Sequence, residues 1–211
     1  MMDPVFRFDI VQGSEEWDNI RAGKVTGTTA KTLLVSGKGE SGFGVGAITQ
    51  SYRVAHEIIT GKKRDSFKGN AATKFGHENE PLAIEEYELT YFRKVQAVGF
   101  VQSGEYLGTS PDGLIPDIKK GIECKCLPVE HAKILDTNQF DQDHYKQCQW
   151  NLFITKYESW DLVYFHPDFT GSSKMRVFTF KPDALMHDQW KLRVEDFKKL
   201  VDKKVSNILN N

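Results

Sequence analysis

The sequence has 211 residues, of which 39% are hydrophobic and 27% are charged, and its formal net charge is −1 at pH 7. This composition excludes a disordered chain, and the charge excludes a protein that holds nucleic acid by bulk positive charge alone. We expect a single domain over residues 1–211, in which any nucleic-acid contact comes from a local basic patch or from a channel formed on oligomerisation.

The sequence also indicates where the protein acts. No apolar run approaches the ~20 residues of a membrane span, so we expect no membrane contact. The first ten residues carry acids and no apolar core, which argues against a signal peptide. The three cysteines, Cys124, Cys126 and Cys148, favour a reducing compartment over a disulfide scaffold. We therefore expect a cytoplasmic protein.

The N-terminal part predicts two short helices. Ser14 is a candidate N-cap for a helix that carries Arg21 and ends at Gly23. Residues 31–34 resemble the start of a second helix, directly after a threonine-rich segment that contains Thr28. Hydroxyls and free N–H groups at a helix start, with an arginine nearby, could bind a phosphate. The alternative is simple capping, with the arginine at the surface.

Residues 36–46 contain five glycines and predict a mobile loop, which carries Lys38. A solvated connector is the alternative. A helix over 48–60 should end at Gly61, and the basic cluster Lys62–Arg64 that follows is most simply a solvated helix end.

A longer helix is expected over 71–91, and one of its faces sets Glu80 among small and apolar neighbours such as Ala83 and Tyr87. A buried carboxylate is costly unless it is paired or bound to metal, so Glu80 is a candidate site residue. Pro81 predicts a kink or break beside it, and the alternative is a helix that begins only at Pro81.

The stretch from residue 107 to 126 carries the strongest chemical signal. Residues 94–102 have strand character and lead into Ser110–Gly113, a turn in which proline fixes φ and glycine accepts a positive φ. The turn predicts a hairpin or a corner between two strands. In the strand that follows, period-two alternation places Glu123 and Lys125 side by side on one face, close to Asp112.

Two acids beside a lysine suit phosphodiester hydrolysis. Carboxylates are ligands for Mg²⁺, which polarises a phosphoryl oxygen and lowers the pKa of a bound water. A lysine can hold that water or offset the charge that grows on the phosphate. For Glu123 and Lys125 alone, a salt-bridged solvent face is the alternative, and the upstream Asp112 favours the metal site.

After an irregular stretch through residue 140, the chain predicts a helix over 141–154 that contains Gln147. Strands are expected over 159–166 and 175–180, followed by a helix over 183–209 whose apolar stripe packs on the sheet. This order of elements predicts an α/β fold with a mixed central β-sheet flanked by helices.

Four blocks of the sequence resemble the lambda exonuclease and YqaJ-type viral recombinase family, within the PD-(D/E)xK nuclease superfamily. They lie in family order and together span most of the chain: 17–23 with 26–28, 76–81, 110–113 with 123–126, and 147–149. The resemblance implies the restriction-endonuclease-like core of that superfamily. It also implies a Mg²⁺-dependent exonuclease that degrades linear double-stranded DNA from 5′ to 3′ and leaves 3′ overhangs for recombination by strand annealing.

The same resemblance assigns a metal centre. It implies that Asp112, Glu123 and the main-chain carbonyl of Cys124 are metal ligands, and that Glu80 completes a second metal position or assists the nucleophile. Two Mg²⁺ ions per active site are implied, with Mn²⁺ as a substitute. Three acids that converge without metal would repel one another and raise at least one pKa.

The remaining roles concern water and DNA. Lys125 would orient or activate the attacking water, and Gln147 would position Lys125 or the phosphate. Arg21 and Thr28 match residues that receive the 5′-phosphate of the strand being cut. Lys38 lies where the family places a basic contact to DNA.

The resemblance implies partners as well: a ring-shaped homotrimer around duplex DNA, and a single-strand annealing protein, in a bacterial cell that hosts the phage or prophage. The chain departs from the family pattern at His144, where a tyrosine is frequent, and we assign His144 no role. The alternatives are a PD-(D/E)xK endonuclease, restriction-like or structure-specific, and a DNA-end-binding module without catalysis. An iron–sulfur nuclease is disfavoured because no cysteine cluster lies near the C-terminus.

Overall fold

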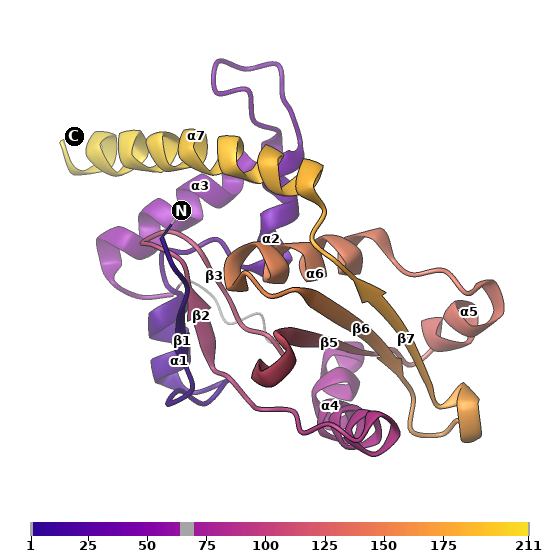
Figure 1. Ribbon diagram of the computed structural model, residues 1–211. Coiled ribbons are helices and arrows are strands. Elements are labelled where there is room, and N and C mark those ends of the chain that lie inside the picture. Colours follow the sequence, from indigo (N-terminus) through magenta and orange to yellow (C-terminus); the bar gives the residue numbers. More distant parts are fainter. Residues whose placement is uncertain (1, 64–69, 211) are drawn as a thin grey trace.

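The computed structural model describes residues 2–63 and 70–210, and Figure 1 shows their arrangement. The helices in this part of the chain are α1 (Glu15–Arg21), α2 (Gly27–Ala30), α3 (Val45–Thr60), α4 (Ala71–Tyr91), α5 (Glu130–Thr137), α6 (Gln142–Thr155) and α7 (Ala184–Leu209), with short 3₁₀ turns η1 (Lys31–Leu34), η2 (Pro116–Ile118) and η3 (Gly171–Ser173). None of these helices combines the length and the apolar character that a membrane span requires.

A four-stranded mixed sheet forms the centre of the fold, as the order of elements predicts. Its strands lie in the order β4 (Gly113–Ile115), β5 (Lys120–Cys126), β6 (Ser159–Phe165) and β7 (Met175–Phe180). The β5 and β6 strands are parallel, whereas β4 and β7 pair antiparallel at the two edges. The pairing of β4 with β5 reaches only from Lys120 to Ile122, so the second half of β5 has a free edge on that side.

A second sheet is antiparallel and smaller, and it consists of β1 (Val5–Arg7), β2 (Phe100–Gln102) and β3 (Gly108–Thr109) in that order. The sequence did not predict β1, and the strand expected over 94–102 is real only in its last three residues. Before them, Gln96 makes a single bridge to Leu114. A strand of three residues, such as β1, is too short to show an alternating pattern in its sequence. It forms because it pairs with β2, and this contact cannot be read from the local sequence.

The central sheet lies between two layers of helices. In Figure 1, α6 covers one face and α4 covers the other. Several residues of β5 and β6 that face α4 are apolar, among them Ile122, Cys124 and Phe165, so the strand cysteines are core residues, as predicted. On the opposite face, Leu162 and Tyr164 pack with α6 and α7 in the main core.

Most helices agree with their sequence signals. Ser14 caps α1 by accepting from the N–H of Trp17, and Gly61 ends α3 with a φ of 65°. Helix α4 is one helix from Ala71 to Tyr91 with Pro81 inside it, so the alternative start at Pro81 is wrong. Two details differ: residues 31–34 form a 3₁₀ turn, and the stretch expected to be irregular contains α5.

The loop predicted over 36–46 is real in large part, since α3 begins at Val45, and it projects beyond α7 in Figure 1. Its base is held from α7, where Arg193 Nε donates to the carbonyl of Leu33 and Nη2 to that of Gly42. The guanidinium also lies 3.8 Å from the ring centre of Phe43. The loop is therefore tied to α7 at its base.

Candidate active site

The Ser110–Asp112 segment is a corner between the two sheets, because β3 before it belongs to the small sheet and β4 after it belongs to the central sheet. Gln12 holds this corner by donating to the carbonyls of Pro111 and Val98, at 2.8 and 2.9 Å. The predicted positive φ at Gly113 is wrong. Glycine is needed there for space, since a Cβ would lie 2.1 Å from Cγ1 of Val95.

The predicted alternation along β5 is confirmed. Glu123 is 2% exposed and faces α6 rather than solvent, so the salt-bridged solvent face is excluded. Its Oε1 accepts from Lys125 Nζ at 2.8 Å and from Gln147 Nε2 at 2.5 Å, and Gln147 Oε1 accepts from Lys125 at 3.1 Å. The three side chains therefore form a closed ring of hydrogen bonds between β5 and α6.

The sequence reasoning missed Asn151, which bonds the other oxygen of Glu123. Asn151 is buried, and its Nδ2 donates to Glu123 Oε2 at 3.0 Å, while its Oδ1 accepts from the hydroxyl of Thr109. Gln147 and Asn151 are one helical turn apart, so α6 presents two amides to one carboxylate. The sequence contained one signal for Asn151: it is a polar residue four positions after Gln147, in a segment of the helix that is largely apolar.

Three carboxylates from different elements converge at the free edge of β5. Asp112 comes from the corner, Glu123 from the α6 face of β5, and Glu80 from α4 on the other face. Burial raises the pKa of Asp112 well above its usual range, and the charges of Glu123 and Glu80 add to this effect. Burial and then the charge of Glu123 also raise the pKa of Glu80. The predicted repulsion among these acids is therefore present.

The charge of Lys125 opposes this repulsion. Burial favours its neutral amine, but the carboxylates of Glu123 and Asp112 outweigh burial and raise its pKa above the usual value. Lys125 is therefore an ammonium in the metal-free site.

One cavity of about 510 Å³ brings the predicted residues together. Every predicted site residue except Lys38 lines it: Arg21, Thr28, Glu80, Asp112, Glu123, Cys124, Lys125 and Gln147. Lys38 is exposed on the loop beside α7 and does not line the cavity.

The donor set fits Mg²⁺. In the described residues no group of three or more His, Cys, Asp and Glu side chains forms a ready metal cage. Mg²⁺ does not require one, because it binds through one or two carboxylates and fills its shell with water and phosphate oxygens. Asp112 Oδ2 accepts from the N–H of Cys124 at 2.7 Å, which leaves Oδ1 available. Glu123 Oε2 has one donor, Asn151, and therefore keeps a lone pair.

The backbone of Cys124 supports its predicted role as a carbonyl ligand. The N–H of Cys124 points away from β6, towards the free edge of β5, and donates to Asp112. In a β-strand, the N–H and C=O of one residue point to the same side. The carbonyl of Cys124 is therefore directed to the edge where Asp112 lies.

The other end of the cavity carries a half-buried cation. Arg21 lies 4.0 Å from the ring centre of Trp17, and its Nη1 donates to the hydroxyl of Ser110 at 2.8 Å. The indole N–H of Trp17 donates to the same hydroxyl at 2.9 Å. The Nε of Arg21 is buried and has no hydrogen-bond partner among the described residues. Burial lowers the pKa of Arg21 to about 10, so it stays charged at neutral pH.

Only part of the basic cluster after α3 is shown to lie near the cavity. Lys63 pairs with Asp18 at 2.5 Å and lies 4.9 Å from the ring centre of Trp17, so it is close to the arginine end of the cavity. Arg64 lies outside the described residues.

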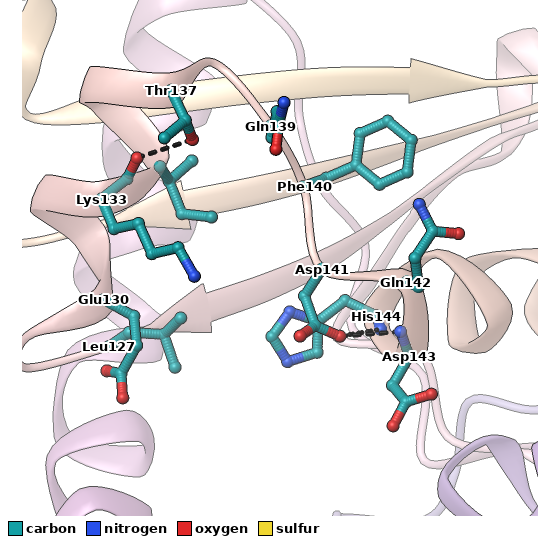
Figure 2. A pocket seen from close by; sticks show the side chains of 11 residues that line it. Leu127, Glu130, Lys133, Thr137, Gln139, Phe140, Asp141, Gln142, Asp143 and His144 are labelled. Carbon is teal, nitrogen blue, oxygen red and sulfur yellow. Dashed lines mark hydrogen bonds between the residues drawn. The ribbon is translucent and has the colours of Figure 1, made fainter.

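A second cavity of about 530 Å³ lies between α5 and the start of α6 and shares Leu127 with the first. Figure 2 shows Lys133 pointing into it and His144 beside Asp141. His144 bonds the hydroxyl of Tyr164 at 3.0 Å, and burial, together with the ammonium of Lys125, lowers the pKa of His144 to about 4.

Comparison with known proteins identifies the family and the fold. Residues 16–158 match the family model described as the YqaJ-like viral recombinase domain. A comparison with curated protein sequences gave no match. An alkaline exonuclease from Laribacter hongkongensis superposes with a TM-score of 0.81 at 22% identity, over 93% of this chain and 97% of that one.

Two further solved structures have the same fold. The Laribacter hongkongensis enzyme in complex with dAMP gives a TM-score of 0.80 at 23% identity, over 92% of this chain and 96% of that one. A phage-related exonuclease from Haemophilus somnus 129PT gives 0.70 at 16% identity, over 88% and 96%. The family model covers well over half of the sequence, and on that basis the chain belongs to the YqaJ-like viral recombinase domain family.

Proposed function

We propose that this protein is a Mg²⁺-dependent exonuclease that hydrolyses one strand of linear duplex DNA from its 5′ end and leaves a 3′ overhang. Membership of the family supports a nuclease that acts on DNA. The finer proposal depends on one observation: a single cavity holds the acid–lysine centre at one end and the Arg21–Ser110 pair at the other. In this proposal, the Arg21–Ser110 pair receives the end phosphate of a strand while its scissile phosphate lies at the acid–lysine centre.

At the acid end, Asp112, Glu123 and the carbonyl of Cys124 would hold the metal, and Glu80 would complete a second position. Bound Mg²⁺ supplies a polarised phosphoryl oxygen and a water of lowered pKa. Lys125 donates from its ammonium to the attacking water or to the phosphoryl oxygens as their charge grows. The hydrogen-bonded amide of Gln147 fixes where that ammonium lies.

At the other end, Arg21 and Ser110 suit a 5′-phosphate. The hydroxyl of Ser110 accepts from both Trp17 and Arg21, so its own proton is free to donate. The guanidinium stays charged, and charge-assisted bonds to phosphate are among the stronger hydrogen bonds. Thr28 lines the same cavity.

We propose further that three copies form a ring around the duplex, and that a single-strand annealing protein receives the 3′ strand in the cytoplasm of a bacterium that carries the phage or prophage. The support is the family membership and the net charge of −1, which cannot hold DNA by bulk attraction. Lys38 on the projecting loop would then contact DNA. Light scattering in solution tests the trimer.

The test is digestion of linear duplex DNA labelled at the 5′ or the 3′ end, with a closed circle as control, in Mg²⁺ or chelator. The 5′ ends carry either a phosphate or a hydroxyl group. We expect Mg²⁺-dependent release of the 5′ label first, faster from phosphorylated ends, with the circle intact. Cutting of the circle would replace the exonuclease by an endonuclease. No cleavage with any divalent metal would leave a DNA-end-binding module.

A further inference from the structure

A buried polar cluster lies on the α4 face of the sheet, away from the cavity, and it is centred on Asp161 of β6. We infer that Tyr87, which ties α4 to this cluster, is a positioning residue that holds Glu80 in the metal centre. The inference rests on the proposed function, because it concerns the same site.

The Asp161 carboxylate joins four elements of the fold. It is 1% exposed and accepts from Tyr87 of α4 at 2.6 Å, from Lys120 of β5 at 2.9 and 3.1 Å, and from Thr179 of β7 at 2.7 Å. Buried charges are stable only when they are paired and hydrogen-bonded in this way. The hydroxyl of Tyr87 is the only one of these donors that comes from a helix.

The position of Tyr87 on α4 connects the cluster to the site. Tyr87 follows Glu80 by two helical turns and lies on the same face, with Ala83, which is completely buried, between them. At the other end of this face, a Cβ on Gly76 would lie 3.9 Å from the carbonyl of Cys126.

The register of α4 against β5 follows from these contacts. Gly76 lies at the end of β5, and Tyr87 reaches a carboxylate that is bonded by Lys120 at its beginning, so the helix and the strand run in opposite directions. About 16 Å of helix then spans about 20 Å of strand. Glu80 lies along this span, near the free edge at Cys124, and a slide of α4 would carry Glu80 away from it.

Two features favour a contact that holds α4, and with it Glu80, against the sheet. Glu80 shares the cavity with the carboxylates of Glu123 and Asp112, whose like charges oppose its own. Pro81 has no N–H, so the helix lacks one hydrogen bond beside Glu80. Two other ties from this part of α4 are partly exposed, and exposed pairs stabilise little: Glu86 pairs with Lys174 at 2.6 Å, and Glu88 pairs with Lys94 at 2.7 Å and accepts from the N–H of Val95 at 2.7 Å.

The test compares two variants that remove one hydrogen bond each from the same carboxylate. Tyr87→Phe removes the bond from α4, and Thr179→Val removes the bond from β7. We measure Mn²⁺ binding by electron paramagnetic resonance, the Mg²⁺ concentration for half-maximal digestion, and KM for DNA. For Tyr87→Phe we expect metal binding weakened about three- to tenfold, less than the 10–100-fold typical of a residue that bonds a ligand directly.

In the same variant, KM for DNA and the rate at saturating metal stay near those of the wild type. Thr179→Val leaves all three quantities unchanged, and Glu86→Gln does the same. Equal weakening of metal binding in Tyr87→Phe and Thr179→Val would overturn the inference, since the cluster would then act through the sheet and not through α4. A lower melting temperature of Tyr87→Phe with unchanged Mn²⁺ binding would also overturn it. If the wild type itself binds no Mn²⁺ and cuts no DNA, the proposed function fails instead.

Discussion

The Nδ2 atom of Asn151 donates to Glu123 Oε2 at 3.0 Å, on the opposite carboxylate oxygen from the one that Lys125 and Gln147 bond. Both partners of this bond are nearly inaccessible to solvent. The bond therefore fixes the rotation of the Glu123 carboxylate and decides which lone pair remains for a metal.

We expect Asn151→Ala to lower metal affinity and the rate of digestion about 10–100-fold, because residues that orient metal ligands have effects of this size. The loss of a buried partner also costs about 1–3 kcal/mol of unfolding free energy. Gln149→Ala is the matched control: Gln149 is a buried amide of α6 that bonds the N–H of Asp183 and the carbonyl of Lys181, away from the metal centre. Equal losses of activity in both variants would show that Asn151 acts through stability alone.

Much of the site could be predicted because its signals are local. Alternation in one strand sets Glu123 beside Lys125, and the Ser110–Gly113 turn places Asp112 eleven residues before Glu123. The central sheet followed from strands and helices that have clear boundaries and periods.

The features that the sequence reasoning missed depend on tertiary contacts. Asn151 has a role because its amide reaches Glu123 of the central sheet, while Thr109 of the small sheet donates to its Oδ1. Helix α5 begins after Val129, which gives no side-chain cap, so no start signal marks it. Gly113 was interpreted through its φ, whereas Val95, which is distant in sequence, is the reason for glycine there.

Lys125→Ala should strongly reduce cleavage while DNA binding remains. The ammonium of Lys125 is the cation inside the acid centre, and loss of one such preorganised donor lowers rates about 10²–10³-fold. Binding of labelled duplex is followed by fluorescence anisotropy in Ca²⁺, and cleavage is followed in Mg²⁺. Lys119→Ala, which removes an exposed partner of Glu158, is the control for loss of charge. A Lys125→Ala protein that still digests DNA at the wild-type rate would remove Lys125 from the mechanism.

Arg21→Lys tests the phosphate end of the cavity. Lysine keeps the charge but loses the planar group that lies over Trp17 and reaches Ser110. We expect the ratio of digestion rates for 5′-phosphorylated and 5′-hydroxyl ends to fall towards one, with the rate on hydroxyl ends almost unchanged. The hydroxyl substrate is the internal control. A ratio equal to that of the wild type would mean that another group receives the phosphate.

Without metal, the stability of the protein should depend on pH through the raised pKa of Asp112. Because the pKa of Asp112 is raised in the folded protein, the folded state binds this proton more tightly than the unfolded chain does. Stability in chelator therefore falls as pH rises above about 4, the ordinary value for aspartate. Asp112→Asn lacks this charge, so its melting temperature should exceed that of the wild type by a margin that grows with pH.

Mg²⁺ provides the complementary observation. It should raise the melting temperature of the wild type at neutral pH, since a ligand that binds the folded state stabilises it. In Asp112→Asn the same addition should have little effect. An equal Mg²⁺-dependent increase in both proteins would show that Asp112 does not hold the metal.

The effect of His144 on the pH dependence of stability should be opposite to that of Asp112. Its pKa is lowered to about 4, so between pH 6.5 and about 4 the unfolded chain binds a proton that the folded protein does not. The free energy of unfolding therefore falls as pH decreases through this window, by at most about 1.4 kcal/mol per pH unit from this group. His144→Gln keeps a polar group of similar reach near Tyr164 but removes the titration. Urea unfolding from pH 4 to 8 should then give a curve for the variant that is flatter on the acid side, and two parallel curves would contradict the assignment of this slope to His144.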